Sequence, residues 1–156
     1  MPRPVLQCRD DILRMLDELT EEREAILKTC ESLSLAQLAD PVIPNTWSVL
    51  KNLQHLAWAE EYMLAWIKKR PVVLPRAEFP KEPLLELPAL RIALDEAHAA
   101  AIAFLKGNPE SVLTEPCKYG RDARDETVGG VFFHLIEHEI GHRAFVRFKL
   151  RQLQSV

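Results

Sequence analysis

The sequence predicts an all-α protein built as a four-helix bundle. Four long stretches repeat their apolar residues at the three- and four-residue spacing of an amphipathic helix, and no segment shows the alternating pattern of a strand. Two long connections, residues 70–87 and 108–126, separate these stretches. Connections of this length allow a crossover between helices in place of tight hairpins. With 156 residues, the chain is expected to form a single domain, residues 1–156.

Capping residues and apolar spacing define the first helices. Residues 10–30 keep helical spacing behind two aspartates that favour a helix start. Residues 34–37 have the form of a capping box and predict one short helical turn. A second long helix is expected over residues 47–69. Its middle section is so apolar that His55 should be buried.

Proline and glycine mark the remaining helix ends. The first connection contains four prolines and cannot form a helix interior, so it is a linker. Pro88 suits the first turn of a third helix, which Gly107 ends. The second connection includes a turn-like run at residues 119–122, and its length is typical of lids and binding loops. Thr127 is a suitable cap for a last helix that reaches about Leu153.

Composition limits the expected partners and compartment. A net charge of −3 and a pI near 6.0 give no general attraction to nucleic acid or to an acidic membrane. No apolar run reaches the roughly 20 residues of a membrane span, and no signal-peptide pattern is present, so a cytoplasmic location is expected. Cys8, Cys30 and Cys117 are widely spaced and are expected to be reduced thiols.

Three of the five histidines recur every four residues on the last helix. Because a helix turns by about 100° per residue, His134, His138 and His142 form one stripe. The surrounding residues are apolar on nearly all sides, which predicts a buried helix. Buried imidazoles need partners, and metal binding through neutral ring nitrogens accounts for three of them at this spacing.

Helix geometry limits how many of these histidines can bind one ion. Neighbouring members of the stripe lie about 6 Å apart along the axis, whereas the outer pair spans about 12 Å. The ion can therefore take His134 and His138, or His138 and His142, and needs a third ligand from elsewhere. His55 is the natural donor, because helical bundles build metal sites from side chains on facing helices.

Glu139 favours the second pair. With His138 and His142 it reads H-E-x-x-H, in which two metal ligands flank a carboxylate that can activate bound water. We therefore predict His55, His138 and His142 as ligands, Glu139 as a general base, and His134 as a neighbour of the ligands or a pocket residue. A zinc peptidase is less favoured, because the residues after His142 contain neither an acidic ligand nor the H-x-x-G-x-x-H continuation.

Each of these residues also has an ordinary structural explanation. Core histidines can be satisfied by backbone or carboxylate hydrogen bonds, and His55 could bond to Glu60 or Glu61. Glu139 could face an arginine or solvent. His98, on an alanine-rich helix, is expected at the boundary of the core. Coordinates in which the predicted ligands lie apart would favour these alternatives.

These residues carry a resemblance to a known family. Trp47 and Ser48 at the start of the second helix, His55 beyond them, and a last helix reading H-x-x-x-H-E-x-x-H-R resemble the DinB-like (DinB/YfiT) family of metalloenzymes. The match extends over nearly the whole chain. The resemblance implies a four-helix bundle in up-down-down-up order, and a metal held here by His55, His138 and His142.

Two departures from the family pattern concern the surroundings of the site. The family often has Gly-Gln where this chain has Ala144 and Phe145, and often a histidine where Gly141 stands. Relatives include transferases and isomerases that use bacillithiol or mycothiol, so the resemblance implies a low-molecular-weight thiol as cosubstrate. It also implies a homodimer.

The sequence supports two functional hypotheses. The first is a metal-dependent enzyme acting on a small molecule, a transferase or a hydrolase, because three imidazoles leave a divalent ion with an open position. Zinc and nickel both suit such ligands. The alternative is a non-catalytic stress-response or interaction module in which the metal braces the core. A fourth protein ligand would favour bracing, and an open position facing a pocket would favour chemistry.

Overall fold

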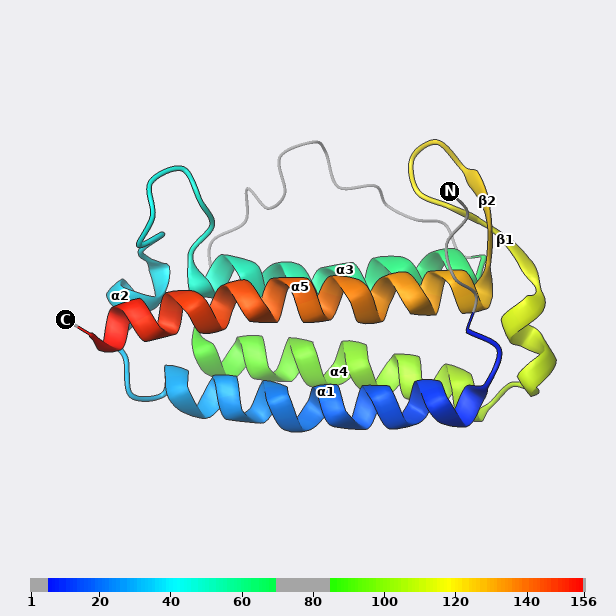
Figure 1. The fold of residues 1–156 in the computed structure, drawn as a ribbon, viewed down its shortest axis with the longest axis horizontal. Helices are drawn as coiled ribbons and strands as arrows, with labels where there is room; N and C mark the ends of the chain where they lie inside the picture. The colour runs from blue at the N-terminus through cyan, green and yellow to red at the C-terminus, as the bar shows by residue number, and fades with distance from the viewer. Residues whose placement is uncertain (1–5, 70–84, 156) are drawn as a thin grey trace.

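Four long helices form the body of the protein, as the sequence predicts (Figure 1). The computed structural model describes residues 6–69 and 85–155. The long helices are α1 (Arg9–Cys30), α3 (Val49–Ile67), α4 (Leu87–Lys106) and α5 (Val128–Gln154), and the short helix α2 (Leu35–Ala39) follows α1.

The helices run in up-down-down-up order. In Figure 1, α1 and α5 run in one direction and α3 and α4 in the other. Helix α3 packs against α4 and α5, and α1 packs against the same two helices. Because α3 and α4 are parallel, the end of α3 and the start of α4 lie at opposite ends of the bundle, as a crossover requires. Residues 70–84 of the predicted linker lie outside the described residues.

Side-chain caps begin three of the helices. Ser34 and Gln37 form the predicted capping box at α2, each accepting a hydrogen bond from the backbone N–H of the other. Ser48 caps α3, which therefore begins two residues later than expected. Thr127 accepts a hydrogen bond from the N–H of Gly130, which confirms the predicted start of α5.

The connection between α4 and α5 contains more secondary structure than expected. It forms a 3-10 helix, η1 (Glu110–Thr114), and an antiparallel hairpin of β1 (Pro116–Tyr119) and β2 (Arg124–Thr127). The prediction of no strands was wrong because each strand has four residues and β2 is almost entirely polar. The predicted turn is confirmed between the strands, where Gly120 adopts a φ of 78°.

Apolar residues from all four long helices make the core. The predicted face of α1 is confirmed, because its six apolar residues are at most 5% exposed: Ile12, Leu16, Leu19, Ile26, Leu27 and Cys30. Phe132 of α5 is the largest fully buried side chain. Within the described part of the chain, no helix combines the length and the apolar composition that a membrane span requires.

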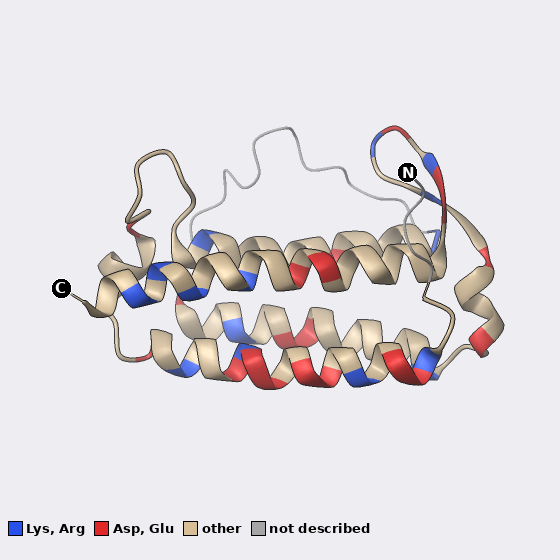
Figure 2. Ribbon diagram, in the orientation of Figure 1, with Lys and Arg blue, Asp and Glu red and all other residues tan. Residues whose placement is uncertain are grey.

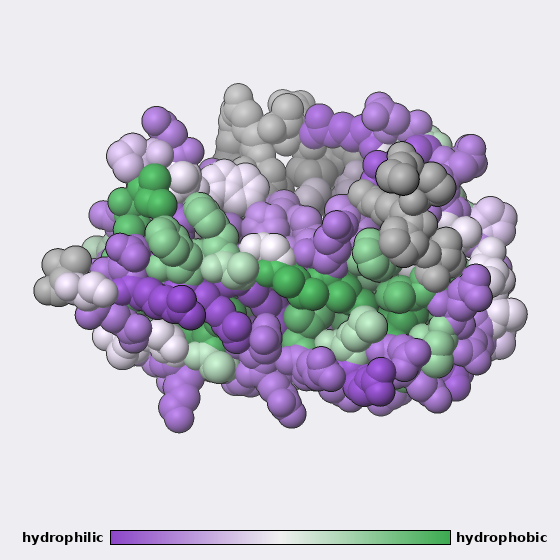
Figure 3. Space-filling model, viewed as in Figure 1, coloured by the Kyte–Doolittle hydropathy of each residue, from purple (hydrophilic) through white to green (hydrophobic). Residues whose placement is uncertain are grey.

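Helix α5 is less buried than its composition predicts. The exposed fraction is 55% for Ile140, 36% for Phe145 and 45% for Phe148. Apolar surface follows the groove between α1 and α5 (Figure 3), which Ile136 and Ile140 help to line. Acidic residues gather on α1 and basic residues toward the C-terminal end of α5 (Figure 2). The predicted burial of α5 is therefore confirmed for Val131, Phe132, Leu135, Ile136 and Val146, and wrong for Ile140 and Phe145.

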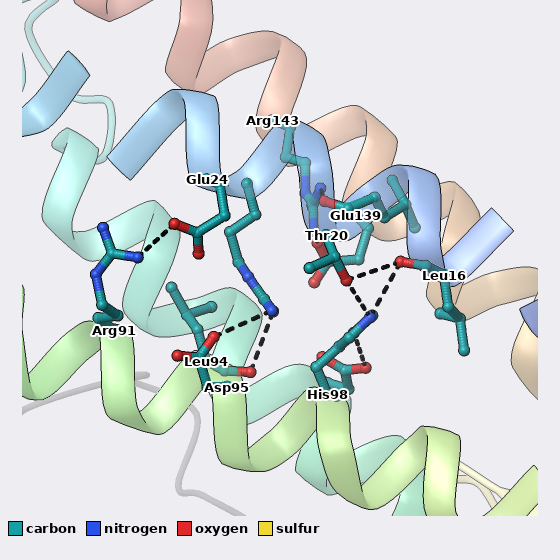
Figure 4. A network of polar contacts seen from close by, with 12 residues as sticks. Leu16, Thr20, Glu24, Arg91, Leu94, Asp95, His98, Glu139 and Arg143 are labelled. Atoms are coloured by element: carbon teal, nitrogen blue, oxygen red, sulfur yellow. Dashed lines mark hydrogen bonds and ion pairs between the residues drawn. The ribbon is translucent and has the colours of Figure 1, made fainter. Parts of the chain in front are cut away.

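The core also encloses a polar network that connects the four helices (Figure 4). His98 of α4 is only 3% exposed, so its predicted boundary position was wrong. Its Nδ1 lies 2.9 Å from Oε1 of Glu60 on α3. Its Nε2 lies 3.0 Å from Oγ1 of Thr20 on α1. Two hydrogen-bonding ring nitrogens therefore tie α4 to both of its neighbours.

Two buried arginines extend this network. Arg143 of α5 binds Glu139 through Nε at 2.7 Å and Nη2 at 2.5 Å, and also donates to the carbonyl of Leu19. Arg23 of α1 donates to the carbonyl of Leu94 at 3.1 Å and pairs with Asp95 at 3.2 Å. Buried charges are tolerated only when paired, so these contacts constrain how the helices can pack.

We expect Glu139→Ala to destabilise the metal-free protein by about 3–5 kcal/mol, because it leaves a buried guanidinium without its carboxylate. The free energy of unfolding is measured in urea. Glu137→Ala is the matched control on the same helix, where the side chain is 61% exposed; its effect should stay below about 0.5 kcal/mol. Equal effects of the two substitutions would contradict the assignment.

Candidate metal centre

Three histidines from two helices converge between α3 and α5. His55 lies on α3, and His138 and His142 lie one turn apart on α5. One donor nitrogen of each lies within 4.8 Å of the others, and the Nε2 atoms of His55 and His138 are 3.0 Å apart. Ligand nitrogens around a tetrahedral ion lie about 3.3 Å apart, given bonds of about 2.0–2.1 Å. The structure therefore brings the predicted ligand set together at nearly the spacing of a metal site.

His134 lies beside this cluster and is not part of it. Its ring centroid is 5.8 Å from that of His138 and 5.8 Å from that of Tyr119. Its Nδ1 is 3.5 Å from a carboxylate oxygen of Glu137. Among the described residues, the group of converging donors consists of His55, His138 and His142. Of the two pairs that helix spacing allows, His138 and His142 are therefore the pair that converges with His55, and their role as metal ligands stays a prediction.

Glu139 points into the buried network instead of toward the histidines. Consecutive helix residues are about 100° apart, so Glu139 faces a different side of α5 from His138. Its carboxylate pairs with Arg143, which was one of the alternatives considered from the sequence. The proposed role of Glu139 as a general base stays a prediction. Of the two alternative partners of His55, Glu60 bonds to His98 and Glu61 is exposed.

Burial keeps the three imidazoles neutral at pH 7. Desolvation, together with a smaller effect of the neighbouring His142, lowers the pKa of His55 from 6.5 to about 4. Desolvation and the neighbouring histidines lower the pKa of His138 to about 3. Desolvation also lowers the pKa of His142. Only neutral imidazole has a lone pair available for a metal, so the three predicted ligands are in the protonation state that metal binding requires.

Asn52 orients His142, a role that our sequence analysis did not identify. Its Oδ1 lies 3.0 Å from Nδ1 of His142. Its Nδ2 donates to the carbonyls of Trp47 and Ser48, at 3.2 and 2.8 Å, which fixes the orientation of the amide. Nδ1 of His142 therefore carries the hydrogen, and Nε2 keeps its lone pair. The available signal was the i, i+3 spacing of Asn52 and His55 on one helix face.

A pocket of about 630 Å³ opens beside two of the histidines. Trp47 forms one wall, with its ring stacked on His142 at 6.0 Å and edge-on to His55 at 4.9 Å. The lining residues are Thr46, Trp47, Asn52, His138, Gly141, His142 and Phe145. The connection 108–126, expected as a lid, does not contribute to this lining in the described part of the chain. Its Tyr119 packs instead against His134 and Tyr62.

Comparison with known proteins identifies the family. The model of the DinB superfamily matches residues 18–146. The chain belongs to the DinB superfamily. The resemblance seen in the sequence is therefore confirmed. No curated protein matches this DinB-superfamily chain significantly.

Solved structures share the fold of this DinB-superfamily member. One of them is YfiT from Bacillus subtilis, which is described as a probable metal-dependent hydrolase with an unusual four-helix bundle topology. It matches with a TM-score of 0.76 and 16% identity, and the match covers 99% of this chain and 93% of that chain. A DinB-like protein from Bacillus cereus has a TM-score of 0.68 and 18% identity, covering 88% and 89%. TT2238, a four-helix bundle protein, has a TM-score of 0.62 and 19% identity, covering 96% and 100%.

We expect the metal-free protein to lose stability as the pH falls from about 6.5 toward 4. In this window the unfolded histidines bind protons, while folded His55 and His138, with pKa values of about 4 and 3, do not. Their contribution is fully present above pH 6.5. Urea unfolding with a chelator at pH 7, 6 and 5 measures the slope. His138→Gln should reduce it, and an unchanged slope would argue against the lowered pKa.

We expect Asn52→Leu to weaken zinc binding by about 10- to 100-fold, because Nδ1 of His142 loses its acceptor. Asn52→Asp keeps an acceptor at the same place and should retain most of the affinity. Competition with a chromogenic chelator gives the dissociation constants, and thermal melts of the metal-free variants check that both fold. Wild-type affinity in the leucine variant would contradict the role of Asn52.

Proposed function

We propose that this DinB-superfamily protein is a metal-dependent enzyme that acts on a small molecule. In this proposal His55, His138 and His142 hold one divalent ion. The observation that carries it is the convergence of three neutral imidazoles beside an open pocket. Three imidazoles whose donor nitrogens lie within 4.8 Å of one another suit a shared ion better than they suit apolar packing.

The donor set fits zinc or nickel. All three donors of the described cluster are imidazole nitrogens, which suit these ions better than magnesium or calcium. Neutral ligands leave the full positive charge of the ion in place. A divalent ion bound there would supply Lewis acidity and lower the pKa of a water molecule or thiol. A site with three protein donors instead of four leaves one coordination position of the ion open, which favours chemistry over a purely structural role.

The protein contributes orientation and the exclusion of water. Asn52 holds the tautomer of His142, and Trp47 covers the rings of His142 and His55. The pocket exposes His138 and His142 to a ligand from one side. Arg143 keeps Glu139 in the core, so no step of the proposal relies on that carboxylate.

Hydrolysis and thiol transfer are both consistent with this site. The description of YfiT as a probable metal-dependent hydrolase supports the first. The family resemblance supports the second, with a low-molecular-weight thiol as cosubstrate. A peptidase has less support, because helices and the segment before α3 line the pocket, and the hairpin that could pair with an extended peptide lies near His134. The homodimer and the cytoplasmic location stay predictions.

The test is metal content followed by activity. Wild-type protein loaded with zinc or nickel and dialysed should retain one ion per chain by mass spectrometry. His138→Ala should lose most of it, because two imidazoles remain. His134→Ala is the matched control and should keep the ion. Full stoichiometry in His138→Ala would contradict the proposed ligand set.

Loaded wild-type protein is then screened with low-molecular-weight thiols plus electrophiles, and separately with small esters and amides. Turnover that disappears in His138→Ala and persists in His134→Ala supports the enzyme. A loaded protein that is inactive across both panels would favour the bracing module.

A further inference from the structure

We propose that the pocket beside the histidines takes a small anion carrying a flat apolar group, and that Gly141 sets the room for that group. The proposal rests on the proposed function, because the ion would hold the anionic end. It adds the chemical class of the ligand and a residue that determines specificity.

Gly141 is not required by packing. It lies in the interior of α5, where glycine is less stable than alanine. A Cβ at this position would meet no heavy atom within 4 Å. Gly130 differs, because a Cβ there would collide with the side chain of Glu126. Since Gly141 lines the pocket, the missing side chain leaves space beside His138 and His142.

Aromatic side chains border this space. Trp47 stands over the histidines and lines the pocket together with Phe145. Phe145 is 36% exposed, although a phenyl ring gains free energy from burial. A flat apolar ligand would cover such rings by stacking or edge-to-face contact.

The polar side chains of the lining are already bonded within the protein. Oγ1 of Thr46 donates to the carbonyl of Ile43 at 2.8 Å and accepts from Nζ of Lys149 at 2.7 Å. The amide of Asn52 is used by two backbone carbonyls and by His142. The lining is therefore poorly suited to a sugar or another ligand with many hydroxyl groups, and it favours an apolar body.

One lysine lies over each of the two aromatic rings, and Lys149 is buried. Nζ of Lys51 lies 5.4 Å from the ring centroid of Trp47, and Nζ of Lys149 lies 4.8 Å from that of Phe145. None of the described residues that line the pocket is acidic. These charges and the bound ion would both attract an anion. The ligand class is thus an anionic metal-binding group attached to a flat apolar body.

The test compares two probes with the same metal-binding group. Acetohydroxamate carries a methyl group and benzohydroxamate a phenyl group. Each is titrated into full-length protein loaded with cobalt(II), and the visible spectrum of the ion reports binding. We expect benzohydroxamate to bind at least about tenfold more tightly, because its ring buries additional apolar area.

Two variants locate the preference. Gly141→Leu fills the space and should remove the preference while acetohydroxamate still binds. Phe145→Ala, at an exposed position, should reduce the preference for benzohydroxamate. If Gly141→Leu does not fold, the Phe145→Ala variant alone tests the inference. Ala144→Leu adds the same bulk on the side of α5 that lines the groove with α1, and should leave the preference unchanged.

Equal affinity for the two probes in the wild type would overturn the inference and leave the proposed function standing. A preference that persists in both Gly141→Leu and Phe145→Ala would overturn it as well. Failure of the chain to bind cobalt, or of both probes to change its spectrum, would count against the proposed function, and the inference would fall with it.

Discussion

The packing of α3 against α5 is the contact on which the site depends. It places His55 opposite His138 and His142, and a shift of one residue in either helix would rotate a donor by about 100° away from the others. The buried network fixes both helices against their other neighbours. Glu60 of α3 bonds to His98 of α4, and Arg143 of α5, which pairs with Glu139 of the same helix, donates to the carbonyl of Leu19 on α1. A shift of either helix would leave buried polar groups without these partners.

The arrangement separates two kinds of polar group on α5. On one side of α5, Glu139 and Arg143 neutralise each other and are closed to solvent. On the other side, His138 and His142 are kept neutral by burial and border an open pocket. One helix therefore carries a buried ion pair on one face and, on another, the histidines that we propose as metal ligands. Glu139, the glutamate of the H-E-x-x-H motif, therefore belongs to the paired groups that are closed to solvent.

Sequence patterns predicted what depends on local spacing. The four helices, the caps Ser34 and Thr127, and the convergence of His138 and His142 follow from periodicity and helix geometry. The environment of His98 and the bond between Asn52 and His142 do not follow from local spacing, because each depends on a partner many residues away in the chain. The hairpin was missed because strands of four residues carry almost no alternation. The exposure of Ile140 was missed because composition cannot show which apolar side is left uncovered.

The long separation in the chain between His55 and the two histidines of α5 affects how the cluster assembles. His55 and His138 are 83 residues apart in the chain, with the whole of α4 between them. A ribosome therefore releases His55 well before His138 and His142, and loop closure over that distance must come first. In the proposed metal site, capture of an ion would in this way be a late event that requires α5 to have docked. Chains that lack α5 would present only one of the three proposed ligands.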